Sequence, residues 1–103
     1  MSTLKKIQRE QNKWSAYNFA KRNIHWAILG LMEELGELAH ALLKREQGIR
    51  GEDHEHEAAE KDALGDLLIF ACEFANQRGY DLHNIVTETW ESVKQRDWRE
   101  YPQ

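Results

Sequence analysis

The placement of helix-breaking residues is the feature that most constrains how this chain folds. Its single proline, Pro102, lies beyond the last stretch in which apolar residues recur at helical spacing. Three of the six glycines, Gly48, Gly51 and Gly79, fall between such stretches. Ile, Val and Thr together make up only 11 of the 103 residues, so segments that favour β-strands are nearly absent. The sequence therefore predicts an all-α protein.

Apolar periodicity and capping residues predict four helices, over residues 3–22, 24–46, 55–78 and 82–99. Asn23 and Asp81 are suited to cap helix N-termini, and Gly79 is suited to end the third helix. The polar residues 47–54 contain two glycines and are expected to form a loop. We expect one domain over residues 1–103, resembling a four-helix bundle. A domain of this size buries a limited core, so other subunits are expected to add to it.

Charge and hydropathy exclude several functional classes. The net charge is −4 and no block of Lys or Arg forms a basic stripe, so a nucleic-acid polymer is not an expected partner. No run of 18 apolar residues is present and the mean hydropathy is −0.80, so we expect no membrane span. The one cysteine, Cys72, has apolar neighbours and is expected to be a buried thiol. A cytoplasmic location is the expectation.

Acidic side chains border the apolar arc of the helix expected over residues 24–46. At about 100° per residue, Glu34 lies at the edge of that arc, and Glu37 lies next to Glu34 on the same side. Glu33 points further from the arc. The alternative for any one of these residues is an ordinary solvated acidic face.

A second acidic strip lies on the helix expected over residues 55–78. This helix is apolar nearly all round, so we expect it to be buried between its own bundle and another subunit. This strip carries Asp62, Asp66 and Glu73 within about 40° of one another. Like charges at this spacing repel, and buried carboxylates are costly unless they are paired or bind a metal. Carboxylate oxygens suit Mg²⁺, Mn²⁺ or Ca²⁺. The two strips therefore suggest a site for a divalent cation.

The acidic motifs also resemble those of a known family. Glu33-Glu34-Leu35-Gly36-Glu37, followed by Leu64-Gly65-Asp66-Leu67-Leu68, is similar to the all-α nucleoside triphosphate pyrophosphohydrolases of the MazG-like kind. Their pattern is E-E-x-x-E, a spacer, and E-x-x-D. The resemblance extends to residues 8–14 and 79–98 and so covers most of the chain. It implies Mg²⁺-dependent hydrolysis of a (deoxy)nucleoside triphosphate to the monophosphate and pyrophosphate, a role in removing unwanted nucleotides, and assembly as a homodimer or homotetramer.

The resemblance also implies roles for individual residues. Glu34, Glu37 and Asp66 would be metal ligands, with Mg²⁺ or Mn²⁺ as the metal. Glu33 and Glu34 would be catalytic, with Glu33 either a further ligand or the base that activates water. The family has Glu three residues before the Asp, where this chain has Ala63. Our hypothesis is that Asp62, one residue earlier and still on the same face, replaces that ligand.

Candidate substrate contacts come from both ends of the chain. Lys94 and Arg96, near the end of the last helix, could bind phosphates, although basic residues at a helix C-terminus need no ligand to explain them. Trp14 could stack on a base, as could Trp26, although core packing is the alternative for both. Asn18 could read the edge of a base.

Three other functions remain open on the sequence alone. The first is a nucleotide-binding or interaction protein that has lost turnover, which Ala63 would favour. The second is a phosphoribosyl-ATP pyrophosphatase, which the double glutamate and long spacer fit less well. The third is a di-iron carboxylate protein, because Glu37 and His40 form one E-x-x-H pair, but the second pair such a centre needs is broken by Ile69.

Overall fold

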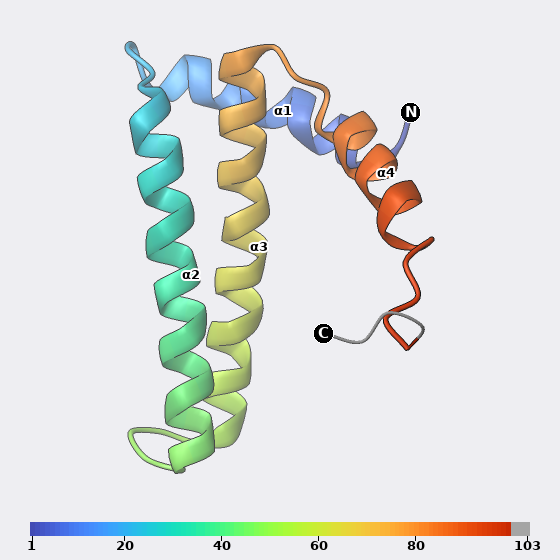
Figure 1. Ribbon diagram of the computed structural model, residues 1–103. Helices are drawn as coiled ribbons and strands as arrows, with labels where there is room; N and C mark the ends of the chain where they lie inside the picture. The colour runs from blue at the N-terminus through green and yellow to red at the C-terminus, as the bar shows by residue number, and fades with distance from the viewer. Residues whose placement is uncertain (100–103) are drawn as a thin grey trace.

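The computed structural model describes residues 1–99, and these residues form four α-helices joined by loops, with no strand (Figure 1). The helices are α1 (Thr3–Asn18), α2 (Ile24–Gln47), α3 (Asp53–Arg78) and α4 (Leu82–Val93). The predicted all-α class is therefore confirmed.

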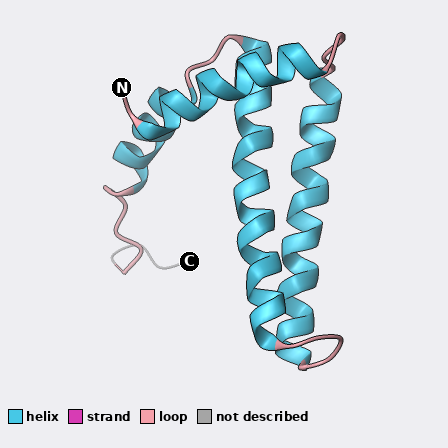
Figure 2. Cartoon of the chain, turned by 180° about the vertical axis from the view of Figure 1, so that it is seen from behind, coloured by secondary structure: helices cyan, strands magenta, loops and turns pink. Residues whose placement is uncertain are grey.

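The helical bundle of one chain is open. Helices α2 and α3 run antiparallel along their whole length, whereas α1 crosses one end of this hairpin and α4 leads away from it (Figures 1 and 2). Helix α1 packs on α3 and α4, and α4 also touches α3. The radius of gyration is 16.8 Å, compared with about 13 Å for a compact chain of roughly 100 residues. One chain thus leaves much of its helical surface uncovered.

Small residues line the contact between α2 and α3. Ala27, Gly30 and Ala41 of α2 are buried, as is Ala63 of α3. At Gly30 the helices meet so closely that an added Cβ would lie 2.3 Å from the ring of Phe70. A real Cβ cannot occupy that position, so glycine is what allows the Phe70 ring to lie against the backbone of α2.

Polar side chains attach α1 to α3. The Gln8 side-chain amide donates to Asn76 Oδ1 at 2.9 Å and to the Tyr80 carbonyl at 2.8 Å, and its oxygen accepts from the Leu82 N–H at 3.0 Å. Asn76 in turn donates to the Gln8 carbonyl and to Gln11 Oε1. Gln8 and Gln11 are buried, and these bonds satisfy their polar groups. The network therefore fixes where α1 lies and also ties down the α3–α4 turn.

Two helices are shorter than predicted. Helix α1 ends at Asn18 rather than at residue 22, because Phe19 adopts an extended backbone conformation and the chain turns towards α2. Helix α4 ends at Val93 rather than at residue 99. Its apolar stripe ends at Val93, and the positions that would continue it are Arg96 and Asp97, so no packing supports a further turn.

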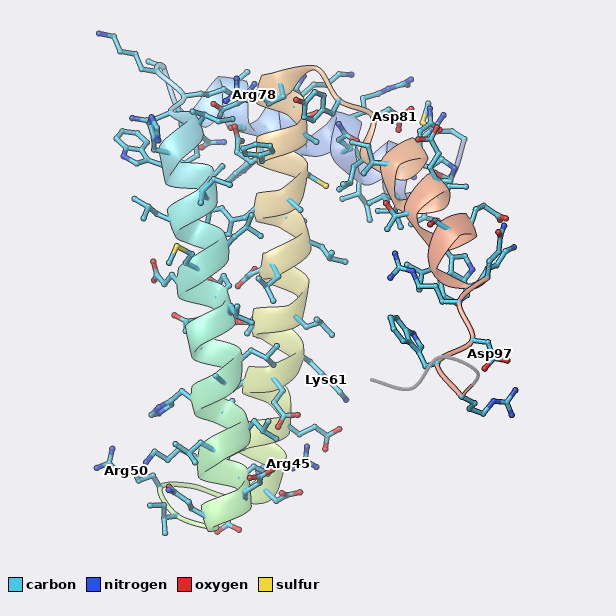
Figure 3. All side chains as sticks on the ribbon, viewed as in Figure 1. Arg45, Arg50, Lys61, Arg78, Asp81 and Asp97 are labelled. Atoms are coloured by element: carbon cyan, nitrogen blue, oxygen red, sulfur yellow. The ribbon has the colours of Figure 1, made fainter. Side chains whose placement is uncertain are left out.

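Helix α3 begins at Asp53, two residues earlier than predicted. The Glu55 side chain accepts from the Glu52 N–H at 3.1 Å, which satisfies a free donor at the start of the helix. Arg45 of α2 donates to Asp53 at 2.7 Å and to Glu60 at 3.1 Å (Figure 3). These contacts hold α2 and α3 together at the end of the hairpin where the α2–α3 loop joins them.

Large apolar side chains are unusually exposed. Within residues 1–99, the buried apolar residues are four alanines and Cys72. By contrast, Leu35 of α2 is 58% exposed, Leu68 of α3 is 57% exposed and Trp90 of α4 is 58% exposed. Among the described helices, none is long and apolar enough to cross a membrane. Exposed apolar side chains thus occur on α2, α3 and α4 alike.

We expect Asn76→Ala to lower the free energy of unfolding by about 1–3 kcal/mol, because it leaves Gln8 and Gln11 groups without partners in a half-buried region. Urea titration followed by circular dichroism measures this change. Gln95→Ala, at an exposed amide beyond α4, is the control and should change stability by less than about 0.5 kcal/mol. Equal effects of the two substitutions would contradict the structural role assigned to the network.

Candidate functional site

Glu34 lies in the contact between α2 and α3. The sequence placed it at the edge of the apolar arc, but the buried residues Ala27, Gly30 and Ala41 lie on either side of it on the same stripe of α2. Its Oε2 atom is buried and has no hydrogen-bond partner. A buried carboxylate oxygen without a donor is costly, so this atom calls for either a proton or a cation.

The antiparallel packing of α2 on α3 brings the predicted acidic residues of the two helices to the same height along the hairpin. Glu34 follows Gly30 by four residues, and Asp66 precedes Phe70 by four, so the Gly30–Phe70 contact sets these two carboxylates opposite each other. Burial raises the pKa of Glu34, and the nearby charges of Glu37, Asp66 and Glu33 raise it further, as does a hydrogen bond with Glu37. The four carboxylates therefore act on one another across the hairpin.

Asp62 lies towards the outside of this group. It is exposed, and it lines one pocket with Glu33 and Glu37 and another with Asp66. The charges that raise the pKa of Glu34 come from the other carboxylates. Asp62 is thus a neighbour of the acidic group and is accessible to a ligand in the pocket that it shares with Glu33 and Glu37. Its role as a replacement ligand stays a prediction.

Ala63 occupies the place that the family pattern gives to a ligand. It is 2% exposed and faces α2. Seven residues separate Gly30 from Glu37 on α2, and seven separate Phe70 from Ala63 on α3, so Ala63 lies opposite Glu37. A glutamate at this position would point at the acidic group, whereas alanine contributes only a methyl group to the packing.

The acidic group fits a hard divalent cation in its chemistry. It offers only carboxylate oxygens, which Mg²⁺ and Mn²⁺ prefer, and one of these oxygens is buried without a partner. In the conformation described for residues 1–99, however, no three His, Cys, Asp or Glu side chains converge closely enough to hold a metal ion. A cation would therefore have to draw Glu34, Glu37 and Asp66 together.

A pocket of about 420 Å³ opens beside Glu34 and Asp66, between α1, α2 and α3. Aromatic rings form much of its wall, namely those of Trp14, Phe19, Trp26 and Phe70. Trp14 packs edge-on against Phe19, with 5.7 Å between the ring centres. The pocket thus joins flat apolar walls to a carboxylate edge.

Charged and polar residues from the α1–α2 loop, Lys21, Arg22 and Asn23, also line this pocket. Phe19, Lys21 and Arg22 are not among the site residues predicted from the sequence. Their signal was the sequence Phe19-Ala-Lys-Arg-Asn23, which places an aromatic residue and two cations directly before a helix cap. The sequence predicts a helix through residue 22, whereas α1 ends at Asn18, so residues 19–22 form a loop that the prediction missed.

Only some of the residues predicted to contact the substrate lie at this pocket. Trp14 is at the pocket, and Trp26 is there as well. Asn18 instead donates to the Trp14 carbonyl at 2.8 Å, one turn back in its own helix. Lys94 forms an ion pair with Glu91 at 2.9 Å, beyond the end of α4, a helix that does not pack on α2. The chain by itself does not bring Lys94 to the pocket.

Arg96 also lies outside the pocket. Its guanidinium is 5.9 Å from the ring centre of Trp98, in the segment that follows α4. Both predicted phosphate-binding cations are therefore in a part of the chain that diverges from the α2–α3 hairpin.

Glu73, the third member of the acidic strip on α3, has a structural role. Burial acts to raise its pKa, but hydrogen bonds from Ser15, Gln11 and Gln77, together with the charge of Arg22, lower the pKa overall. Gln11 donates to it at 2.8 Å and Gln77 at 2.6 Å. Its charge is thus already compensated by α1 and by the α1–α2 loop, unlike that of Glu34.

Comparisons with models of protein families, with curated proteins and with solved structures found no match to this chain.

We expect Glu34→Gln to stabilise the metal-free protein at neutral pH. The pKa of Glu34 is raised in the folded state, so Glu34 contributes most to the free energy of unfolding at pH values below the ordinary pKa of 4.5. This contribution is lost as the pH rises through the raised pKa, where the folded chain must carry the charged carboxylate. The melting temperature should therefore rise on substitution at neutral pH and change little below about pH 4.

Mg²⁺ should raise the melting temperature of the parent protein but not that of the Glu34→Gln variant. Glu46→Gln, at an exposed position near the end of α2, is the matched control and should leave both responses unchanged. If Glu34→Gln lowers the metal-free melting temperature, the assignment of an uncompensated charge at Glu34 is wrong.

Proposed function

We propose that the chain is a Mg²⁺-dependent nucleoside triphosphate pyrophosphohydrolase that cleaves a (deoxy)nucleoside triphosphate to the monophosphate and pyrophosphate. The observation that carries this proposal is the unpartnered oxygen of Glu34, which is buried among further carboxylates at the edge of an aromatic pocket. The resemblance of the two acidic motifs to the MazG-like family supports the same reaction. Removal of unwanted nucleotides is the role that goes with it.

Two kinds of surface would contact the substrate: aromatic rings for the base and carboxylates for the metal that binds the phosphates. Trp14 and Trp26 offer flat rings against which a base can stack. Glu34, Glu37 and Asp66 would hold the metal, which when bound neutralises phosphate charge and activates water. Asp62 is the candidate for a further ligand at the outer edge.

The reaction requires a base for the attacking water. Glu33 is exposed and lines the same pocket as Glu37 and Asp62, so its carboxylate can accept a proton from a water molecule in that pocket. The water oxygen would form a new bond to an internal phosphorus, and the bond from that phosphorus to the pyrophosphate would break. Pyrophosphate would leave with its electron pair, and the proton would pass to Glu33.

A second candidate function is nucleotide binding without efficient turnover. Ala63 favours it, because this buried position faces the acidic group and supplies no oxygen. The two functions share a pocket and differ only in whether product appears.

We also propose that the active form is a homodimer or homotetramer. Ile28 and Leu35 of α2 and Leu64 and Leu68 of α3 each lie about 90–140° round from the contact between these helices. Because the two helices run antiparallel, these angles place all four side chains on one side of the hairpin, away from the pocket formed by Glu33, Glu37 and Asp62. All four side chains are exposed. A second copy of this chain presents the same apolar face, so pairing buries both at once.

Pyrophosphate release from a panel of (deoxy)nucleoside triphosphates with Mg²⁺ tests the proposed reaction. We expect pyrophosphate rather than orthophosphate, and at least a tenfold loss of kcat/KM for Asp62→Asn if that residue holds the metal. Parent-like activity of Asp62→Asn would remove it from the site. Metal-dependent nucleotide binding with no product from the parent protein would favour the binding function, and absence of both would overturn the proposal.

Leu68→Glu should disrupt the homo-oligomer, because it places a charge in the apolar face of the hairpin. Light scattering coupled to size exclusion should show the parent as a multiple of 12.2 kDa and the variant at the mass of one chain. Lys13→Glu, at an exposed position on α1, is the control and should keep the parent mass. A parent that is a monomer, or a variant with an unchanged mass, would contradict the assembly.

A further inference from the structure

A second pocket, of about 480 Å³, lies along the hairpin beyond the acidic group. One end of it is acidic and is formed by Glu33, Glu37 and Asp62. The other end, near the α2–α3 loop, is basic and is formed by Lys44, Arg50 and His56. The charge along the pocket therefore changes sign, from the carboxylates at one end to Lys44 and Arg50 at the other.

The basic end is held in place by the loop. Arg50 has φ of 56° and lies between Gly48 and Gly51, both of which also have positive φ. A non-glycine residue in this conformation costs about 1 kcal/mol or more, and such costs are often found where function requires a fixed backbone. His56 Nε2 lies 3.1 Å from the Ile49 carbonyl oxygen, so α3 secures the loop next to Arg50.

The cations at this end are not used to balance acidic residues of the hairpin. Arg50 and Lys44 form no ion pair with any residue in 1–99, and the Lys44 ammonium donates one hydrogen bond, to the neutral side-chain amide of Gln47 at 3.2 Å. Arg45 is different, because Asp53 and Glu60 already neutralise it. Figure 3 shows Arg45 and Arg50 on opposite sides of this end of the hairpin. Two positive charges are therefore available to an anion from outside.

The basic end also has the right register relative to the acidic group. Lys44 follows Glu37 by seven residues, so it lies on the same face of α2, about 10 Å further along the helix. Helical side chains lean towards the N-terminus, which brings the Lys44 ammonium back towards Glu37. An anion held by a cation on the carboxylates would thus be within reach of Lys44.

We propose that this basic pocket, formed by Lys44, Arg50 and His56, binds the terminal phosphates of the substrate and so holds the pyrophosphate that leaves. This inference rests on the proposed function, to which it adds a direction for the substrate along the hairpin. The base lies between Trp14 and Trp26, the cleaved bond lies at the acidic group, and the leaving pyrophosphate lies towards the α2–α3 loop. The same arrangement selects for a triphosphate, because a monophosphate does not extend to Lys44.

Calorimetry with two separate probes in Mg²⁺ tests this inference. Inorganic pyrophosphate reports on the basic pocket, and a nucleoside monophosphate reports on the aromatic pocket. We expect the double substitution Lys44→Met with Arg50→Met to weaken pyrophosphate binding by at least about tenfold, because two charge-assisted contacts are lost. Its affinity for the monophosphate should stay the same. Trp14→Ala should have the opposite pattern, and Lys6→Met, at an exposed site on α1, should change neither.

The outcomes separate this inference from the proposed function. Unchanged pyrophosphate affinity in the Lys44 and Arg50 double variant, with its far-ultraviolet circular dichroism retained, would overturn the inference even if the enzyme is active. Weakened pyrophosphate binding in the double variant, with monophosphate binding retained, would support the inference even if no nucleotide is hydrolysed. The single substitutions provide a second measurement if the double variant does not fold, since each should weaken pyrophosphate binding alone.

Discussion

The close packing of α2 on α3 is the contact on which the rest of the structure depends. It relies on residues with little or no side chain, and at Gly30 this allows the Phe70 ring to approach the backbone of α2 directly. That approach encloses Glu34, which is polar, between alanines and a glycine. The same contact thus provides cohesion for the hairpin and creates the uncompensated carboxylate from which the functional proposal starts. Helix α1 then closes one end of the hairpin through amide hydrogen bonds rather than apolar burial.

Much of the helical content could be predicted from local signals. Asn23, Gly79 and Asp81 mark helix ends where the sequence placed them, because capping depends on a few neighbouring atoms. The spacing of Glu34, Glu37 and Asp66 likewise predicted that acidic stripes would border packed surfaces. Helical geometry alone sufficed for that, because positions three and four residues apart always share a face.

What the sequence did not predict depends on contacts between distant segments. Periodicity identifies an apolar arc on α2, but it does not say which part of that arc meets α3 and which part stays exposed. The small residues around Glu34 define the contact with α3, and the larger arc with Leu35 is left open. In the same way, the end of α1 at Asn18 depends on the turn that brings Lys21 and Arg22 to the pocket. The spacing of Lys44 from Glu37 is enough to predict that both lie on one face of α2. The position of Arg50 beside Lys44 depends on the α2–α3 loop, whose conformation the sequence does not reveal.

The contact between Gly30 and Phe70 links the shape of the aromatic pocket to the distance between two helices. The Phe70 ring is a wall of that pocket and, at the same time, the spacer that sets the separation of α2 and α3. A residue exchange that widens the pocket at this wall must therefore also shift Glu34 relative to Asp66. If the pocket binds the base of the proposed nucleotide substrate, base selectivity and the geometry of the acidic group are coupled, and changes on the α1 side of the pocket, at Trp14 or Phe19, would alter the first without the second.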